Sequence, residues 1–459
     1  MAMPSMPSAS SAHVVTSADR EGGERRGRLG AFATLLVMVV VFSYSAWSWV
    51  HFWQRPDVAA GDRVTLFTQT DFPSIVIASR LVASGRGYAL YDLDAQLQEQ
   101  QRLSAEGYVH LPPGWPLEYP YPYTPFIAVL WSPMSGLPPL TQMALWDLLN
   151  VAGMGIGLWL LLSRLPLASF TRLALLLAAL TCTPFIVNLE QGQSSGLVML
   201  AMGAGIALLR SRAELAGGLV LGLLVFKIQW LPLLVLVLLF KGRWRALAGM
   251  AATCGALLFV TVLTMGIAWA PAYVQLLNTA RAGGGALELD LWYGHGLAGG
   301  LAALLSHAGD AGSPVLTAIT YINALATLLV GMLLFYLWRG AWHPGGGSGT
   351  VPARWDGLMA LTLTATLFTN LQLNTHDLAL LALPAALGTS SLLAHSAAAR
   401  RALWLWYALL WGAYLVPSFA LYTNPVRLTT LVIAAMLVFL GLNLTARCAQ
   451  LAAGLQPDS

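Results

Sequence analysis

The sequence predicts an all-α polytopic membrane protein with about twelve transmembrane helices and a large hydrophilic loop after the first of them. Apolar residues make up 57% of the 459 residues and charged residues only 10%, against roughly 45–50% and 25% in an average soluble domain. Apolar runs long enough to cross a bilayer recur along most of the chain. The 17 Trp and 14 Tyr are the residue types that anchor helices at lipid headgroups. The bilayer is therefore the solvent of this fold.

The predicted spans follow one another along a single domain, residues 29–446. They are 31–50, 141–163, 173–188, 194–209, 244–268, 314–338, 357–374, 378–394, 402–421 and 428–446. Two shorter apolar pieces, 215–226 and 230–240, predict a hairpin of short helices. Residues 1–28, rich in Ser, Pro and charge, predict a disordered tail, and 447–459 form a second tail.

Arginine and lysine mark one side of the membrane. Short basic loops fall repeatedly on the side of the N-terminus, which places both termini in the cytoplasm, with the bacterial inner membrane as the expected location. This orientation requires residues 111–140, with the segments PPGWP and PYPYTP, to remain on the outer side. The outer side then receives a first loop at 51–140 and a second at 271–313, which hold most carboxylates. Any chemistry is therefore expected to be extracytoplasmic.

The sequence lacks the motifs that several functional classes require. The net charge of +4 comes from short basic clusters between apolar runs, so nucleic acid is not an expected partner. Cys182, Cys254 and Cys448 lie far apart, which argues against a disulfide framework or a metal–thiolate pair. We find no Walker motif, HExxH, GxSxG or cluster of metal ligands. Neither a metal nor a cofactor is expected.

Asp71 opens the segment DFPSIVIASRLVASG. The apolar residues of this segment recur at helical spacing and predict an amphipathic helix on the membrane surface. A carboxylate at this position either caps the helix or acts as a general base whose pKa is raised at the lipid boundary.

Lys227 lies at the turn of the predicted hairpin, in FKIQWLP. A cation among apolar residues of a membrane segment is costly and usually functional. Helical arms of about a dozen residues, rising 1.5 Å per residue, are too short to cross the hydrocarbon layer. Lys227 would then lie in the outer leaflet, at the depth of a lipid-linked phosphate. The alternative is a lysine that only reaches the interface.

Polar turns on the outer side supply further candidates. The turn EQGQSSG, which contains Gln193, either caps the next helix or binds substrate. The segment LNTHD places His376 beside Asp377, as structural residues or as part of a site. His295, in WYGHGLAGG, is an interfacial residue or a further substrate contact.

An aromatic stretch punctuated by prolines precedes the second predicted span. Trp115, Tyr119, Tyr121 and Tyr123 belong to a membrane-interface belt or stack on sugar faces.

In this order, these segments resemble a known family. The chain is similar to the polyprenol-phosphate-mannose-dependent mannosyltransferases of glycosyltransferase family 87, which belong to the C-type membrane glycosyltransferases. The matching segments are DFPSIVIASRLVASGRGYALYD, PYPYTPFIAVLWSPMSGLP, GQSSGLVML, AGGLVLGLLVFKIQWLP with the following GRWRAL, and NTHDLALLALP.

The resemblance implies inverting, metal-independent transfer of a sugar, mannose by default, from a polyprenyl-phosphate donor to a hydroxyl of a glycan or glycolipid. It implies Asp71 as the base, His376 as the residue that assists it, and Lys227 at the donor phosphate. A departing phosphate needs cations and an attacking hydroxyl needs a carboxylate. Lys227 with Arg80 would supply the cations. The remaining candidates for substrate contact are Tyr123, Gln193, His295 and Asp377.

The chain departs from the family pattern at two turns, which leaves the substrate open. Thr-His-Asp at 375–377 stands where paired histidines are common, and Tyr-Gly-His at 293–295 stands where Asn-Gln-Ser is common.

Two rival functions remain at this stage. A transporter or flippase would place ionisable groups near the bilayer midplane, whereas here they gather on one side. A glycan polymerase or ligase with a lipid pyrophosphate donor would share the outer-face site. In each case membrane lipid is an expected partner.

Overall fold

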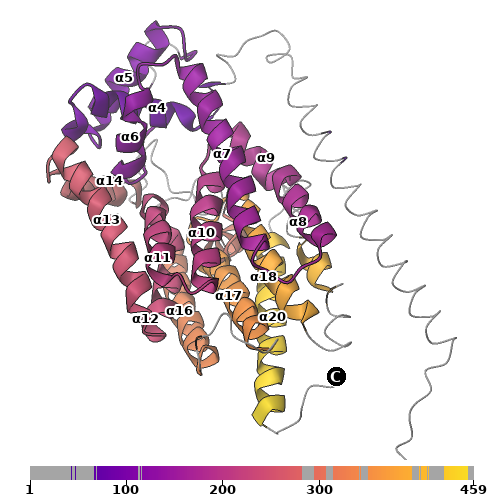
Figure 1. Ribbon diagram of the computed structural model, residues 1–459. Helices are drawn as coiled ribbons and strands as arrows, with labels where there is room; N and C mark the ends of the chain where they lie inside the picture. The colour runs from indigo at the N-terminus through magenta and orange to yellow at the C-terminus, as the bar shows by residue number, and fades with distance from the viewer. Residues whose placement is uncertain are drawn as a thin grey trace, which may run out of the picture.

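The computed structural model describes residues 70–111, 116–281, 294–305, 314–340, 350–394 and 428–452, with a few short pieces between them. In this part of the chain every regular element is a helix (Figure 1), which confirms the all-α class. The predicted spans 31–50 and most of 402–421, the first tail, the end of the second tail and the middle of the second outer loop lie outside the described residues.

Five described helical segments are long and apolar enough to cross a membrane. They are α7 (Pro139–Leu162), α13 (Trp244–Met265), α16 (Pro314–Leu337), the joined η6 (Thr375–Leu381) and α18 (Ala382–Leu393), and the start of α20 (Leu428–Ala452). The pair α8 (Ser169–Thr181) and α9 (Thr183–Glu190) is a sixth if its 41° bend lies within one span. The predicted total of about twelve therefore stays a prediction.

Small residues allow the central helices to pack closely. Helix α10 (Ser195–Arg210) packs against α7, and a Cβ on Gly157 or Gly203 would come within 3.0 Å of the facing backbone. The same holds for Gly196, which lies against Asn150. Such close backbone approach is how membrane helices gain van der Waals contact without a hydrophobic driving force. These glycines fix where α10 begins.

The expected hairpin is formed by α11 (Glu214–Gly222), η3 (Leu223–Trp230) and α12 (Pro232–Phe240). Lys227 has φ −133° and ψ 67°, outside helical values, and interrupts the helix at the turn. An ion pair of 2.7 Å joins Glu214 at the start of the first arm to Arg243 after the second. The two arms therefore start and end at the same level, with Lys227 at the far end.

The described part of the predicted first outer loop forms a cap with its own core. Helices α4 (Phe72–Ala83), α5 (Leu93–Ala105) and α6 (Pro125–Trp131) pack over one end of the bundle, together with α14 (Trp269–Arg281) (Figure 1). From α5, the buried Gln96 accepts a hydrogen bond from Tyr121 N at 2.8 Å and donates one to Leu90 O at 2.7 Å. The proline-rich segment is therefore held by side chains and forms no span.

Two expectations about the cap need correction. We expected α4 to be an amphipathic helix with one face on lipid, but ten of its twelve residues are buried, because its apolar residues occur on every side and the cap surrounds them. Tyr119 and Tyr121 are also buried in this core, so neither can serve as an interface belt or as a platform for a sugar. Only Tyr123 of the described aromatic stretch is half-buried; Trp115 lies outside the described residues.

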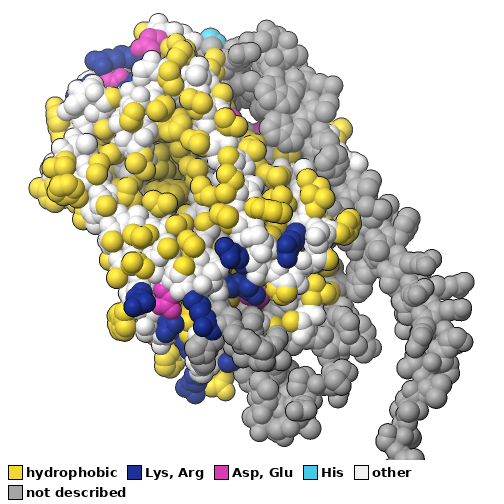
Figure 2. Space-filling model, in the orientation of Figure 1, with side chains coloured by type: hydrophobic (Ala, Val, Ile, Leu, Met, Phe, Trp, Pro, Cys, Tyr) yellow, Lys and Arg dark blue, Asp and Glu magenta, His cyan; other side chains and the backbone are white. Residues whose placement is uncertain are grey.

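The two ends of the bundle differ in charge. Figure 2 shows apolar side chains over the middle of one face, with Lys and Arg gathered toward the lower end. At that end Arg210 bonds both carboxylate oxygens of Asp356, at 2.8 and 3.1 Å. The 16-residue helix α10 separates Arg210 from the cap by about 24 Å, at 1.5 Å per residue.

We predict that Gly157→Ala destabilises the protein, whereas Gly155→Ala does not. A methyl group at Gly157 meets backbone atoms that cannot yield, while a Cβ at Gly155 has no atom within 4 Å. Overpacking of this kind costs about 1–3 kcal/mol. Thermal unfolding of the two detergent-solubilised variants measures the difference, and equal melting temperatures would contradict the close helix contact.

Candidate active site

A polar turn between α9 and α10 is the base on which the site is built. Gly192 has φ +64°, and a Cβ there would come within 3.0 Å of Phe72 Cβ, so glycine meets both requirements. Trp146 Nε1 donates to Gly192 O at 2.9 Å and to Gln193 O at 3.0 Å. Asp71 N donates to Gln191 O at 3.0 Å. The start of α4 is thus bound directly to this turn.

Two buried asparagines hold the turn from below. Asn188 Oδ1 accepts from Ser195 N at 2.7 Å, and Asn150 Oδ1 accepts from Gly196 N at 3.0 Å. Asn188 Nδ2 also donates to Asn150 Oδ1 at 3.3 Å. These bonds satisfy the first amides of α10, which have no partner within the helix. Neither residue was predicted from the sequence as part of the site, although an asparagine within an apolar helix is a usable signal.

The Asp71 carboxylate faces away from its own helix. Asp71 occupies the N-cap position of α4, yet its side chain makes no capping hydrogen bond, and Pro73 removes one of the amides that it would bind. Instead Asp71 Oδ2 accepts a hydrogen bond of 2.6 Å from Gln193 Nε2, which also lies 3.1 Å from the Tyr123 hydroxyl. The structure therefore favours the alternative to a simple helix cap.

Asp71 is exposed, at the edge of an otherwise buried network. Protein groups nevertheless crowd its carboxylate from the inner side. The resulting desolvation raises the pKa of Asp71 above the ordinary 3.8, and the Gln193 hydrogen bond and the positive charge of Lys227 counteract part of this rise. An accessible carboxylate with a raised pKa suits a general base.

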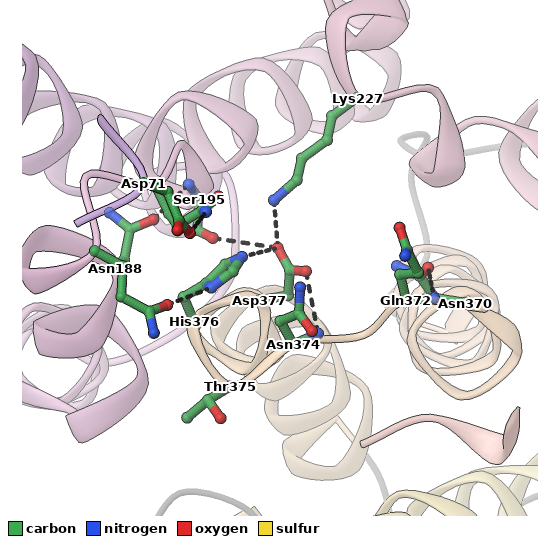
Figure 3. A network of polar contacts seen from close by, with 12 residues as sticks. Asp71, Asn188, Ser195, Lys227, Asn370, Gln372, Asn374, Thr375, His376 and Asp377 are labelled. Carbon is green, nitrogen blue, oxygen red and sulfur yellow. Dashed lines mark hydrogen bonds and ion pairs between the residues drawn. The ribbon is translucent and has the colours of Figure 1, made fainter. Parts of the chain in front are cut away.

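Lys227 and Asp377 form a buried ion pair. Lys227 Nζ lies 2.7 Å from Asp377 Oδ1, and their side chains are 6% and 1% exposed. Asp377 Oδ1 also accepts from Ser195 Oγ at 3.3 Å, and Oδ2 accepts from Asn374 N at 3.3 Å in a capping box at the start of η6. The lysine ammonium points to the buried Asp377 (Figure 3). Snorkelling is thereby excluded.

His376 lies between the two halves of the site. Its Nδ1 is 3.1 Å from Gln191 Oε1 and its Nε2 is 3.6 Å from Asp377 Oδ1 (Figure 3). Gln191 in turn accepts the backbone hydrogen bond from Asp71. His376 is thus linked to Asp71 through Gln191, which the sequence analysis did not name, and contacts Asp377 directly.

Two predicted site residues lie elsewhere. Arg80 is bonded by both terminal nitrogens to Glu106, at 3.0 and 2.8 Å, and follows Asp71 by nine positions, or about 13 Å of helix. His295 Nε2 lies 2.9 Å from Thr375 Oγ1, and Figure 3 shows the Thr375 side chain pointing away from Asp377. The structure therefore brings neither of them together with Lys227.

The assembled residues provide an exposed base beside a buried cation. Within the described ranges, no three side chains of His, Cys, Asp or Glu are grouped so as to hold a metal ion. The arrangement can take a proton from a hydroxyl at Asp71 and place positive charge on an anion near Lys227.

A comparison with known protein families matches residues 121–369 to glycosyltransferase family 87. The matched region is more than half of the chain and contains Tyr123, Gln193 and Lys227; Asp71 precedes it and His376 follows it. Comparisons with curated proteins and with solved structures found no match. The chain belongs to glycosyltransferase family 87 and is a membrane glycosyltransferase.

Proposed function

We propose that the protein transfers a sugar, mannose by default in the family, from a polyprenyl-phosphate donor to a hydroxyl of a glycan or glycolipid acceptor. The transfer inverts the anomeric centre and needs no metal or other cofactor. The observation that supports this proposal most directly is the combination of the exposed Asp71 carboxylate with the buried Lys227 ammonium in one polar network.

The reaction is a single displacement. Asp71 takes the proton of the acceptor hydroxyl while the hydroxyl oxygen bonds to C1 of the sugar. The bond between C1 and the phosphate oxygen breaks, and its electron pair goes to the phosphate. Lys227 stabilises the charge that develops there. Gln193 holds Asp71 in place from the side of Tyr123. Attack opposite the leaving phosphate inverts the sugar configuration.

The charge distribution supports an extracytoplasmic site. Arg210 ends α10, whose first residue lies at the level of the cap, and Lys and Arg gather at the end of the bundle opposite the cap, as expected of the cytoplasmic side. With the termini cytoplasmic in a bacterial inner membrane, the cap and Asp71 face outward. Arg80 has no part in this proposal, because Glu106 occupies its guanidinium.

We predict that Asp71→Asn abolishes transfer and leaves donor binding intact. Loss of a general base costs about 10²–10⁴-fold in rate, while the Lys227 side of the site is untouched. The matched control is Asp94→Asn, an exposed carboxylate in the same loop, which should transfer at the wild-type rate. Sugar transfer is measured with purified protein and a panel of polyprenyl-phosphate sugars. Full activity of Asp71→Asn would refute the assignment of the base.

We predict that protonation of Asp71 causes the loss of kcat/KM on the acid side of the pH profile. The base acts unprotonated, so kcat/KM falls as pH drops through its pKa, which desolvation raises above 3.8. Because the Gln193 hydrogen bond counteracts this rise, Gln193→Leu should move the acid limb to higher pH. Tyr123→Phe retains the hydrogen bond from Gln193 to Asp71 and should leave the acid limb at the wild-type pH. A limb that does not move in Gln193→Leu would assign it to another group.

Lys227→Gln should weaken binding of a prenyl phosphodiester by roughly tenfold to a hundredfold, the value of one charge-assisted hydrogen bond. The amide can still donate to Asp377, which keeps the buried carboxylate partnered. The control is Lys241→Gln, the other lysine of the chain, whose Nζ bonds the carbonyl of Trp338 at 2.7 Å. Calorimetric titration gives both affinities. Unchanged affinity in Lys227→Gln would place the phosphate elsewhere.

A further inference from the structure

The network around His376 holds more negative than positive charge before any donor arrives. Asp71 and Asp377 carry two carboxylates against the single ammonium of Lys227. A prenyl phosphodiester brings another negative charge. If it binds at Lys227, as the proposed function requires, the ammonium must serve two anions.

If the donor phosphate and Asp377 compete for Lys227, Asp377 is the anion that loses its cationic partner. Its carboxylate is fully buried, and apart from Lys227 and the His376 ring its polar contacts are a hydroxyl and a backbone amide. A buried carboxylate without a cation is among the most unfavourable groups in a protein. A second cation beside Asp377 is therefore needed when Lys227 turns toward the phosphate.

His376 is positioned to become that cation. Its Nε2 lies 3.6 Å from Asp377 Oδ1, and its Nδ1 faces Gln191 Oε1 at 3.1 Å. A neutral imidazole has one N–H, whereas an imidazolium has two and can donate to both of these acceptors. The ring thus stands between two oxygens that the charged form satisfies together.

Few other ionisable groups face this ring. Those on the elements packed against η6 and those in the network are Glu190 at the end of α9, Asp71 before α4, Tyr123 beside Gln193, Lys227 in η3 and His295 behind Thr375. The described residues of α10, α17 (Thr350–Thr369) and α18 at this level carry no charge. Asp71 must remain unprotonated to act as the base, so it does not meet the need.

We propose that binding of the phosphodiester donor takes up one proton, which His376 holds against Asp377. This inference rests on the proposed function, because it assumes that the donor phosphate binds at Lys227. Donor affinity then falls as pH rises from the range in which His376 titrates in the free protein to the range in which it titrates in the complex, by up to about tenfold for each pH unit when one proton is coupled to binding.

The test is calorimetric titration of the full-length protein with a methyl phosphodiester of a C15 prenol. This ligand carries one negative charge and no proton that titrates near neutrality. Titrations near pH 8, where a histidine is ordinarily neutral, in two buffers of different ionisation enthalpy count the protons. About one proton per ligand is expected. Binding with equal heats in both buffers would overturn the proton uptake and leave the phosphate site standing; absence of binding would overturn both.

Variants decide which group holds the proton. Asp377→Asn removes the carboxylate that needs a second cation, so it should bind the probe more tightly than wild type near pH 8 with no proton uptake. His376→Gln should bind more weakly, also without uptake. His295→Gln, the matched control from the other side of the same turn, should keep both the affinity and the proton. Proton uptake that persists in His376→Gln would refute the assignment.

Discussion

The carboxylate of Asp377 is the point at which the site is held together. It accepts hydrogen bonds from Lys227, Ser195 and the Asn374 backbone, so it joins the hairpin turn, the start of α10 and the start of η6. A charge buried this deeply is tolerated only with its partners, and removal of one partner of such a pair typically costs about 3–5 kcal/mol. The short hairpin is therefore fixed at its tip, although Lys227 itself interrupts its helical geometry.

The turn before α10 also connects Asp377 to Asp71. Close glycine contacts set the level at which α10 begins, and Asn150 and Asn188 hold its first amides. From this fixed point Ser195 contacts Asp377, while Gln193 contacts Asp71. One short turn thereby sets the distance between Asp71 and the ion pair of Lys227 with Asp377. Side chains far apart in the sequence are positioned by helix packing and not by a flexible loop.

The sequence predicted the long elements well and their contacts poorly. Helices α7, α13 and α16 lie close to their expected bounds, because about 20 apolar residues define a span without reference to neighbours. The burial of α4 and the role of Asp377 as the partner of Lys227, 150 positions away, depend on packing that leaves no local pattern. Asp71, Lys227 and His376 were selected partly through resemblance to a family. Arg80 was selected by charge alone, and Glu106, in the same cap, accounts for it.

Under the proposed function, the difference in exposure between the members of the network separates the position of the acceptor from that of the donor phosphate. Asp71 is exposed, whereas Lys227, His376 and Asp377 are buried, so an acceptor of the proposed reaction would reach Asp71 without entering the charged interior. A buried ammonium without a counterion would be unstable in the absence of donor, and Asp377 supplies that counterion. The ion pair thus keeps the cation in place, and under the proposed function it would do so at some cost in affinity for the donor phosphate. A proton on His376 would recover that affinity only when the donor is present, which links the stability of the empty site to the charge of the occupied one.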